Sequence, residues 1–433
     1  MKIRLHAFLI AVLILLALIG NSSHALSNGS KPVSDMSAEA LPSSELPRDT
    51  VIQFPDQNFE AAVREIIGKP TGDITVNDVA LITELDVSWY DIADLTGIEY
   101  FAALEELSCQ ENLLTELDIS QNTKLKSLAC RMNYLTALDI SHNPALEELG
   151  CEENQLTTLD VSHNPALEYL ACNTNQLTVL DISHNPALED LGCWENQLTT
   201  LDVSHNPALE SLGCYTNQLT VLDVRNNPAL EYLSCWGNQL TTLDVSHNPA
   251  LRTLACDTNQ LTMLDVSQNT ELTWLSCGGN QLTALDVSHN PVLTTFDCDT
   301  NQLTTLDVSQ NTALDSLQCG GNQLTMLDVS HNPALTDLTC SDNQLTALDV
   351  SQNTSLKWLY CGGNQLTALD VSQNTALKWL YCGGNRLTVL DVSHNPEMTD
   401  LTCDRNLFTD PSAIIGLDES RLSLFVFDPQ FDR

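Results

Sequence analysis

Leucine recurs along this chain in a pattern that repeats every 21 residues. A representative unit, residues 167–187, reads Leu-Glu-Tyr-Leu-Ala-Cys-Asn-Thr-Asn-Gln-Leu-Thr-Val-Leu-Asp-Ile-Ser-His-Asn-Pro-Ala, and the next copy begins at Leu188. Its first half alternates apolar and polar positions as a short strand does, whereas its second half is rich in turn-forming Asn, Ser and Pro. A fixed period of about 20 to 50 residues is typical of stacked repeats, so the pattern predicts a solenoid with one short strand in every coil.

Cysteine follows the same period. Fifteen cysteines fall at intervals of 21 residues from Cys109 to Cys403, and the chain contains no others. In the predicted strand Leu170 and Cys172 face the interior, and equivalent residues of successive coils form columns with a spacing of ~4.8 Å. Side chains in one column project in parallel and an odd number cannot all pair, so we expect buried, reduced thiols.

The repeat resembles a known family. The pattern LxxLxCxxNxL, followed by the return segment LTxLDVSxNPA, is similar to the nested 21-residue class called IRREKO repeats in bacterial leucine-rich repeat proteins. Residues 85–104, spaced 22 positions from the next copy, resemble the repeats of internalins, and residues 54–68 resemble their helical cap. The resemblance implies an α/β-type repeat solenoid dominated by short parallel strands. It also implies an arc of about 15–16 coils with a helical N-terminal cap, and adhesion through a macromolecular partner.

The sequence divides into five segments by composition. Lys2 and Arg4 precede an apolar run that is typical of a secretory signal, and the following stretch has the Ser and Pro content of a flexible linker. We expect Asp56 to cap a helix that stops at Gly68, and residues 422–427 to form a strand that covers the last coil. The predicted segments are a signal peptide (1–25), a disordered linker (26–50), a helical N-terminal cap (51–83), the leucine-rich repeat solenoid (84–408) and a C-terminal cap (409–433).

Charge and location narrow the classes of partner. The formal net charge is −40, which repels phosphate backbones and anionic lipids, so we expect no nucleic-acid binding and no membrane insertion of the mature chain. A protein with a basic patch or a neutral glycan remains open as partner. The signal predicts a secreted, extracellular protein and leaves association with a cell surface open.

Polar columns in the return segment have structural and functional interpretations. Two unbroken asparagine columns are expected to satisfy backbone groups. The column from Asp118 to Asp391 holds fourteen carboxylates, and each adjacent pair costs ~0.8 kcal/mol in water. Hydrogen bonds from turn amides and Ser hydroxyls would offset this repulsion, with bound calcium as the alternative. Eight histidines share one register, which either records duplicated cassettes or forms a metal or pH-sensing column. Because every mature Cys and His occupies a repeat register, we predict no enzyme, no cofactor and no metal.

The outward positions around each strand carry the variable residues, and aromatic side chains gather there. Trp194, Tyr215 and Trp236 share one column beside Gly192, Gly213 and Ser234, which are expected to leave the rings uncovered. Trp358, Tyr360, Trp379 and Tyr381 form a two-by-two grid bordered by lysines and glycines. The predicted partner-binding residues are Tyr169, Trp194, Tyr215, Tyr232, Trp236, Trp274, Trp358, Tyr360, Trp379 and Tyr381. Carboxylates crowd the N-terminal half of this surface, namely Glu148, Glu153, Glu168, Glu189, Asp190, Glu195, Glu210 and Glu231.

Three functions follow from this surface. The leading prediction is a secreted, non-catalytic leucine-rich repeat protein that mediates protein–protein interaction, in adhesion or recognition of a host or cell surface, through its concave face. A cell-wall or glycan-binding protein, with sugars stacked on the aromatic grid, is the second. A scaffold or adaptor that assembles through the aromatic face is the third.

Overall fold

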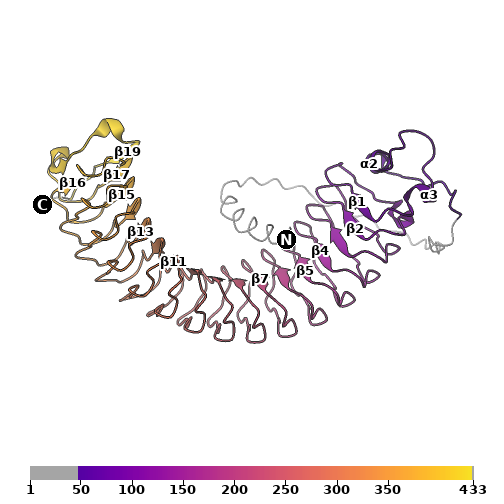
Figure 1. Ribbon diagram of the computed structural model, residues 1–433, viewed down its shortest axis with the longest axis horizontal. Coiled ribbons are helices and arrows are strands. Elements are labelled where there is room, and N and C mark those ends of the chain that lie inside the picture. Colours follow the sequence, from indigo (N-terminus) through magenta and orange to yellow (C-terminus); the bar gives the residue numbers. More distant parts are fainter. Residues whose placement is uncertain (1–46, 432–433) are drawn as a thin grey trace, which may run out of the picture. The chain divides into compact units, whose positions relative to one another are not determined.

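Short parallel strands and turns make up almost all of the protein. The computed structural model describes residues 47–431, in which coil after coil stacks along an arc with the strands on its inner side (Figure 1). The predicted signal peptide and most of the predicted linker lie outside the described residues. The repeat solenoid expected from the 21-residue period is confirmed.

One parallel sheet of 17 strands runs the length of the solenoid, and neighbours in space are neighbours in sequence. Each residue pairs with its equivalent in the next coil, as Leu170 does with Leu191, so register follows the repeat. A two-stranded sheet of β16 (Leu390–Asp391) and β18 (Ile414–Ile415) lies beside it. The strands of the large sheet are β1 (Glu84–Asp86), β2 (Glu106–Ser108), β3 (Ser127–Ala129), β4 (Glu148–Gly150), β5 (Tyr169–Ala171), β6 (Asp190–Gly192), β7 (Ser211–Gly213), β8 (Tyr232–Ser234), β9 (Thr253–Ala255), β10 (Trp274–Ser276), β11 (Thr295–Asp297), β12 (Ser316–Gln318), β13 (Asp337–Thr339), β14 (Trp358–Tyr360), β15 (Trp379–Tyr381), β17 (Asp400–Thr402) and β19 (Leu424–Val426).

Columns of identical apolar side chains fill the interior. The central residue of each repeat strand is a buried Leu, replaced by Phe296 in β11, and the Cys two positions later is buried as well. All fifteen cysteines are free thiols, as predicted. Burial raises the pKa of Cys172 to about 12, because a thiolate would have no solvation inside the coil. These thiols act as small apolar side chains.

Two asparagine columns satisfy the turns, as the sequence predicted. In the first column Asn217 donates from Nδ2 to the carbonyl oxygens of Cys193 (3.0 Å) and Cys214 (3.1 Å), and its Oδ1 accepts from the Leu198 amide (3.0 Å). In the second column Asn206 donates to two carbonyls, whereas its Oδ1 has no hydrogen-bond partner. The side chains of the first column are therefore hydrogen-bonded through both Nδ2 and Oδ1, whereas those of the second column are bonded through Nδ2 alone.

Helices cover the first coil. Helix α2 (Gln57–Ile67) begins after Asp56, whose Oδ1 accepts from the amides of Asn58 (2.8 Å) and Phe59 (3.1 Å), and it ends at left-handed Gly68. Both caps agree with the sequence prediction. The ring of Phe59 stacks 6.5 Å from that of Phe101, which joins the helix to the core. A short helix, α3 (Val76–Val79), follows.

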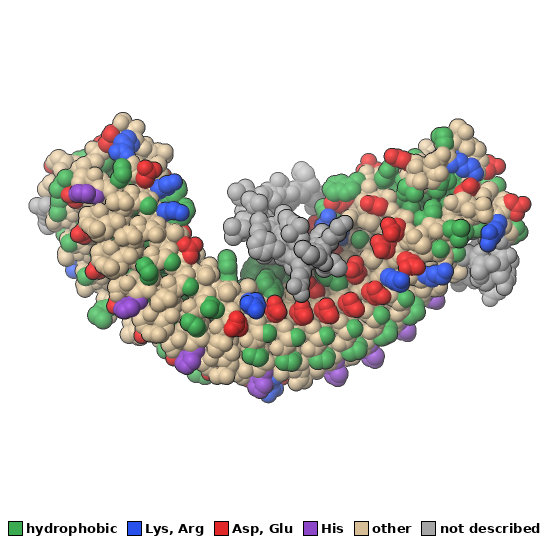
Figure 2. Space-filling model, viewed as in Figure 1, with side chains coloured by type: hydrophobic (Ala, Val, Ile, Leu, Met, Phe, Trp, Pro, Cys, Tyr) green, Lys and Arg blue, Asp and Glu red, His purple; other side chains and the backbone are tan. Residues whose placement is uncertain are grey.

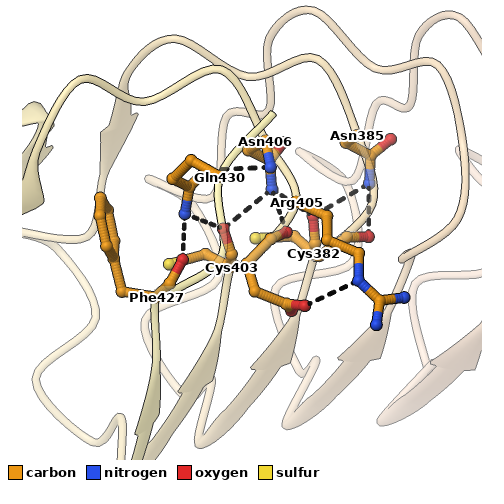
Figure 3. A network of polar contacts seen from close by, with 9 residues as sticks. Cys382, Asn385, Cys403, Arg405, Asn406, Phe427 and Gln430 are labelled. Carbon is orange, nitrogen blue, oxygen red and sulfur yellow. Dashed lines mark hydrogen bonds and ion pairs between the residues drawn. The ribbon is translucent and has the colours of Figure 1, made fainter. Parts of the chain in front are cut away.

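The C-terminal end closes with a strand and one glutamine. Strand β19 pairs with β17 within the predicted segment 422–427 and covers the last repeat. The side chain of Gln430 occupies the place that an asparagine of a further coil would take (Figure 3). Its Nε2 donates to the Cys403 carbonyl (3.3 Å), and its Oε1 accepts from the Asn406 amide (2.9 Å). Gln430 thus gives the Cys403 carbonyl the second donor that an asparagine of another repeat would supply.

Candidate binding surface

The outward-facing positions of the large sheet form the inner surface of the arc, which we call the strand face. All ten predicted binding residues lie on it, in three columns. The first residue of a strand is aromatic at Tyr169, Tyr232, Trp274, Trp358 and Trp379. Tyr360 and Tyr381 are third residues, and Trp194, Tyr215 and Trp236 each follow a strand by two positions. Each ring is therefore placed by strand register.

Trp194, Tyr215 and Trp236 stack as a continuous pile across three coils. The ring centroids are 5.1 Å and 4.7 Å apart, with interplanar angles of 10° and 12°. The expectation that the neighbouring glycines leave these rings uncovered is wrong. A Cβ atom on Gly192 would lie 2.6 Å from Cζ3 of Trp194, so the indole lies directly over that glycine, and Tyr215 is buried between its neighbours.

The predicted two-by-two grid is present as two parallel stacks. The Trp358 and Trp379 rings lie 4.8 Å apart at 5°, and the Tyr360 and Tyr381 rings lie 4.4 Å apart at 8°. Lys357 and Lys378 each place Nζ 6.0 Å from the centroid of the adjacent tryptophan. Ring faces within each stack cover one another, so the surface presents ring edges and the outer faces of the end rings.

The other three aromatic residues join none of these stacks. Tyr169 and Tyr232 are half-buried first residues of β5 and β8, while Trp274 is 45% exposed. In register, Trp274 lies between Thr253 and Thr295, so no ring flanks it along the sheet. The sequence thus located the rings correctly but did not separate stacked from solitary ones.

Several carboxylates on the strand face have raised pKa values because burial disfavours their ionised form. The pKa of Asp190 and that of Asp297 are each raised to about 6, and the pKa of Glu152 is raised as well. Around Gly278, Oδ1 atoms of Asp257 and Asp297 converge to 3.3 and 3.2 Å of the position a Cβ would occupy. Several carboxylates of this face therefore lie close together and are partly removed from water.

The aspartate column of the return segment has its own compensation. Asp160 accepts from the Ser162 amide at 2.9 Å, and the same bond to the residue two positions on recurs along the column. Hydrogen bonds from the Ser162 hydroxyl and amide lower the pKa of Asp160. This is the structural interpretation that the sequence favoured over calcium. The eight histidines of the repeats lie on the outer side, each with Nδ1 near the preceding Ser Oγ, as in Ser246 and His247 at 3.0 Å (Figure 2). Within residues 47–431 no three His, Cys, Asp or Glu side chains form a metal-binding group.

Two further groups of exposed residues escaped the sequence prediction. Trp89, which follows β1 in the first coil, is 69% exposed, and Tyr134 is 50% exposed. Glu147 extends the column of glutamates that immediately precede strands β4 to β8, and a row of acidic side chains is visible along the inner rim (Figure 2). The repeat register would have shown this column if the position before each strand had been aligned.

No helix within residues 47–431 has the length and apolar character needed to cross a bilayer.

Stacked strands, an asparagine ladder and a cysteine ladder together define a leucine-rich repeat protein. Residues 54–185 match the family model described as the leucine-rich repeat domain of the endo-β-N-acetylglucosaminidase EndoS. The solved functional domain of InlJ from Listeria monocytogenes is 40% identical, covering 82% of this chain and 83% of that chain, with a TM-score of 0.79. That domain includes a cysteine ladder. This chain therefore belongs to the internalin-like family of leucine-rich repeat proteins.

Two further comparisons extend the likeness. Full-length internalin J of L. monocytogenes is 42% identical over 71 residues, which are 16% of this chain and 8% of that protein. A leucine-rich repeat protein of Leptospira interrogans is 26% identical over 81% of this chain and 97% of its own, with a TM-score of 0.72. A plant peptide hormone receptor, RGFR1, solved in complex with RGF2, shares the fold at 20% identity over 78% of this chain and 69% of its own, with a TM-score of 0.59.

Proposed function

We propose that this chain is a secreted, non-catalytic protein that recognises a protein partner through the strand face, in adhesion or recognition of a host or cell surface. Internalin-like leucine-rich repeat proteins mediate protein–protein interaction, and the chain belongs to that family. The observation that carries the proposal is the concentration of stacked aromatic rings on the strand face. The Leu, Cys and Asn columns repeat one residue type inside the coils and turns and hold no information about a partner.

Stacked aromatic residues suit recognition for two reasons. They supply large buried area with little side-chain entropy to lose, since each ring is already held by its neighbour. Cross-strand ring pairs also stabilise a sheet by up to ~1 kcal/mol each, so a purely structural role must be separated by experiment. The solitary, 45% exposed Trp274 gains nothing from stacking and argues for contact with a partner.

Glycan binding draws less support from the geometry. Sugars stack on ring faces, but the interplanar angle of 5° and the 4.8 Å separation place the facing surfaces of Trp358 and Trp379 against each other. Competition by soluble oligosaccharide in the binding assay distinguishes this alternative. Self-association of the purified chain would indicate the scaffold alternative.

The test compares three variants as baits against host-cell surface proteins and cell-wall glycan. Trp358→Ala/Trp379→Ala removes one stack and Trp194→Ala/Trp236→Ala removes the outer rings of the other. Met263→Ala/Met326→Ala is the matched control, because each methionine is 77% exposed and lies in the return segment. A protein retained by the native chain and the methionine variant, and lost by a folded tryptophan variant, supports the proposal. Equal retention by all three returns the aromatic residues to a structural role.

A further inference from the structure

A row of carboxylates, four of them without an ion pair, follows the inner rim of the strand face over coils β4 to β8. The column contains Glu147, Glu168, Glu189, Glu210 and Glu231, all exposed (Figure 2). Among the described residues Arg252 approaches Glu231 at 3.7 Å, whereas the first four glutamates make no ion pair. Neighbours ~4.8 Å apart repel by ~0.8 kcal/mol in water. The aspartate column relieves the same repulsion with turn amides, but this glutamate column has no such donors.

The stacked Trp194, Tyr215 and Trp236 stand across the sheet from this glutamate column. Trp194 follows Glu189 by five positions, so the Cα atoms of the two columns are at most ~16 Å apart at ~3.3 Å per residue. Between the columns lie the first strand residues, among them Tyr169, Asp190 and Tyr232, and the third strand residues Gly192 and Gly213, over which the Trp194 indole lies. An α-helix with its side chains is ~10–12 Å across, so one helix fits this width.

The spacing along the solenoid favours a helix over an extended chain. Positions i, i+4, i+7 and i+11 of a helix rise by about 6, 10.5 and 16.5 Å from the first, against ~4.8, 9.6 and 14.4 Å for four glutamates. The mismatch never exceeds ~2 Å, which flexible lysine or arginine side chains absorb. Same-face residues of an extended strand are ~6.7 Å apart and drift by ~6 Å over the same four positions.

We propose that the N-terminal half of the strand face binds an amphipathic helix of the partner lengthwise. A stripe of Lys or Arg on that helix pairs with Glu147, Glu168, Glu189 and Glu210, and an adjacent apolar stripe contacts the aromatic stack. The proposal rests on the proposed function and adds the chemistry and secondary structure of the partner segment. The net charge of −40 favours the approach of such a cationic segment at long range.

Two synthetic 21-residue alanine-rich peptides of identical composition test it. One carries lysines at i, i+4, i+7 and i+11 beside a leucine stripe, and the other distributes the lysines around the helix. Fluorescence anisotropy at about 50 mM salt should show about tenfold tighter binding of the striped peptide, with affinity falling as salt rises. Equal binding of the two peptides, or no binding of either, overturns the proposal.

Charge variants provide the second arm. Replacing Glu147, Glu168, Glu189 and Glu210 by Gln should weaken the striped peptide about tenfold. The matched control replaces four exposed threonines of the return segment by Lys, which changes the net charge equally: Thr157, Thr178, Thr199 and Thr220. An equal loss in both variants means bulk attraction and overturns the proposal. If the chain binds both peptides equally while the Trp194→Ala/Trp236→Ala variant loses a captured protein, only this inference fails. If that variant also keeps the captured protein, the proposed function fails as well.

Discussion

Replacing one asparagine from each column by alanine should have very different costs. Asn343, in the first column, donates from Nδ2 to the carbonyls of Cys319 (3.0 Å) and Cys340 (3.2 Å), and its Oδ1 accepts from the Leu324 amide (2.9 Å). Each carbonyl also accepts from a neighbouring asparagine, at 3.2 and 2.9 Å respectively, and stays satisfied. The Leu324 amide has no second acceptor. Two lost bonds at ~1 kcal/mol and one orphaned buried donor at ~1–3 kcal/mol predict a loss of about 3–5 kcal/mol.

For Asn332, in the second column, we expect a much smaller loss of stability on replacement by alanine. Its Nδ2 donates to the carbonyls of Val308 and Asn311, both at 2.9 Å. Those carbonyls keep backbone partners, since Asn311 donates to Val308 at 3.0 Å and Leu314 donates to Asn311 at 3.1 Å. The Oδ1 of Asn332 is buried without a partner, and its removal relieves ~1–3 kcal/mol. Two lost bonds at ~1 kcal/mol each, less this relief, give a net cost of Asn332→Ala of about −1 to +1 kcal/mol.

Equilibrium urea unfolding, followed by far-UV circular dichroism, measures both losses in the whole chain. The comparison is discriminating because burial alone predicts the opposite order: Asn332 is 0% exposed and Asn343 is 7% exposed. Both substitutions remove the same atoms, so any cavity cost largely cancels in the difference. A larger loss for Asn332→Ala, or equal losses, would refute the hydrogen-bond accounting.

Three further predictions concern backbone strain, titration and thiols. Thr258 has φ of 50°, and its equivalent in the next coil, Gly279, has φ of 62°, a left-handed conformation that favours glycine. Thermal unfolding should therefore show that Thr258→Gly raises stability by about 0.5–1 kcal/mol and that Gly279→Thr lowers it by about 1–2 kcal/mol. The pKa of Asp297 is raised to about 6 in the folded chain, above its unfolded value, so the contribution of Asp297 to stability rises as pH falls from 6 to 4. Asp297→Asn should therefore stabilise the protein by about 1–2 kcal/mol at pH 7.5 and give no gain below pH 4. A stabilisation independent of pH would contradict that cause. Thiol titration should find nearly all fifteen cysteines unreactive in the native protein and all reactive in denaturant, and rapid native labelling of most of them would contradict the burial.

The repeat made the fold predictable to the level of register. A 21-residue period fixes which residues align, so the columns of Leu, Cys and Asn followed from the sequence without any structure. The caps at Asp56 and Gly68 were predictable for a local reason, because a single residue sets each helix end. Gln430 was not, since its role depends on where the chain returns after β19, which no period encodes.

The surface was less predictable than the core. Sequence spacing placed Trp194 next to two glycines but could not say which way the indole turns, and the ring folds over Gly192 where open space was expected. Side-chain rotation at an outward position depends on neighbours in three coils rather than on the local pattern. The unequal satisfaction of the two asparagine columns likewise requires atomic positions, because both columns look identical in the sequence.

A solenoid built from duplicated cassettes places like side chains next to like at ~4.8 Å, and only some residue types tolerate that contact. Aromatic rings stack, amides bond to the turns, thiols pack, and each aspartate of the return segment is held by a turn amide. The glutamate column from Glu147 to Glu210 repeats a charge without any such compensation. The unpaired Oδ1 atoms of the second asparagine column are also uncompensated, but they are buried, whereas this glutamate column is exposed to a partner. A basic partner would offset the repulsion between the glutamates, which is why this column, more than the aromatic stacks that stabilise themselves, indicates the chemistry of the partner.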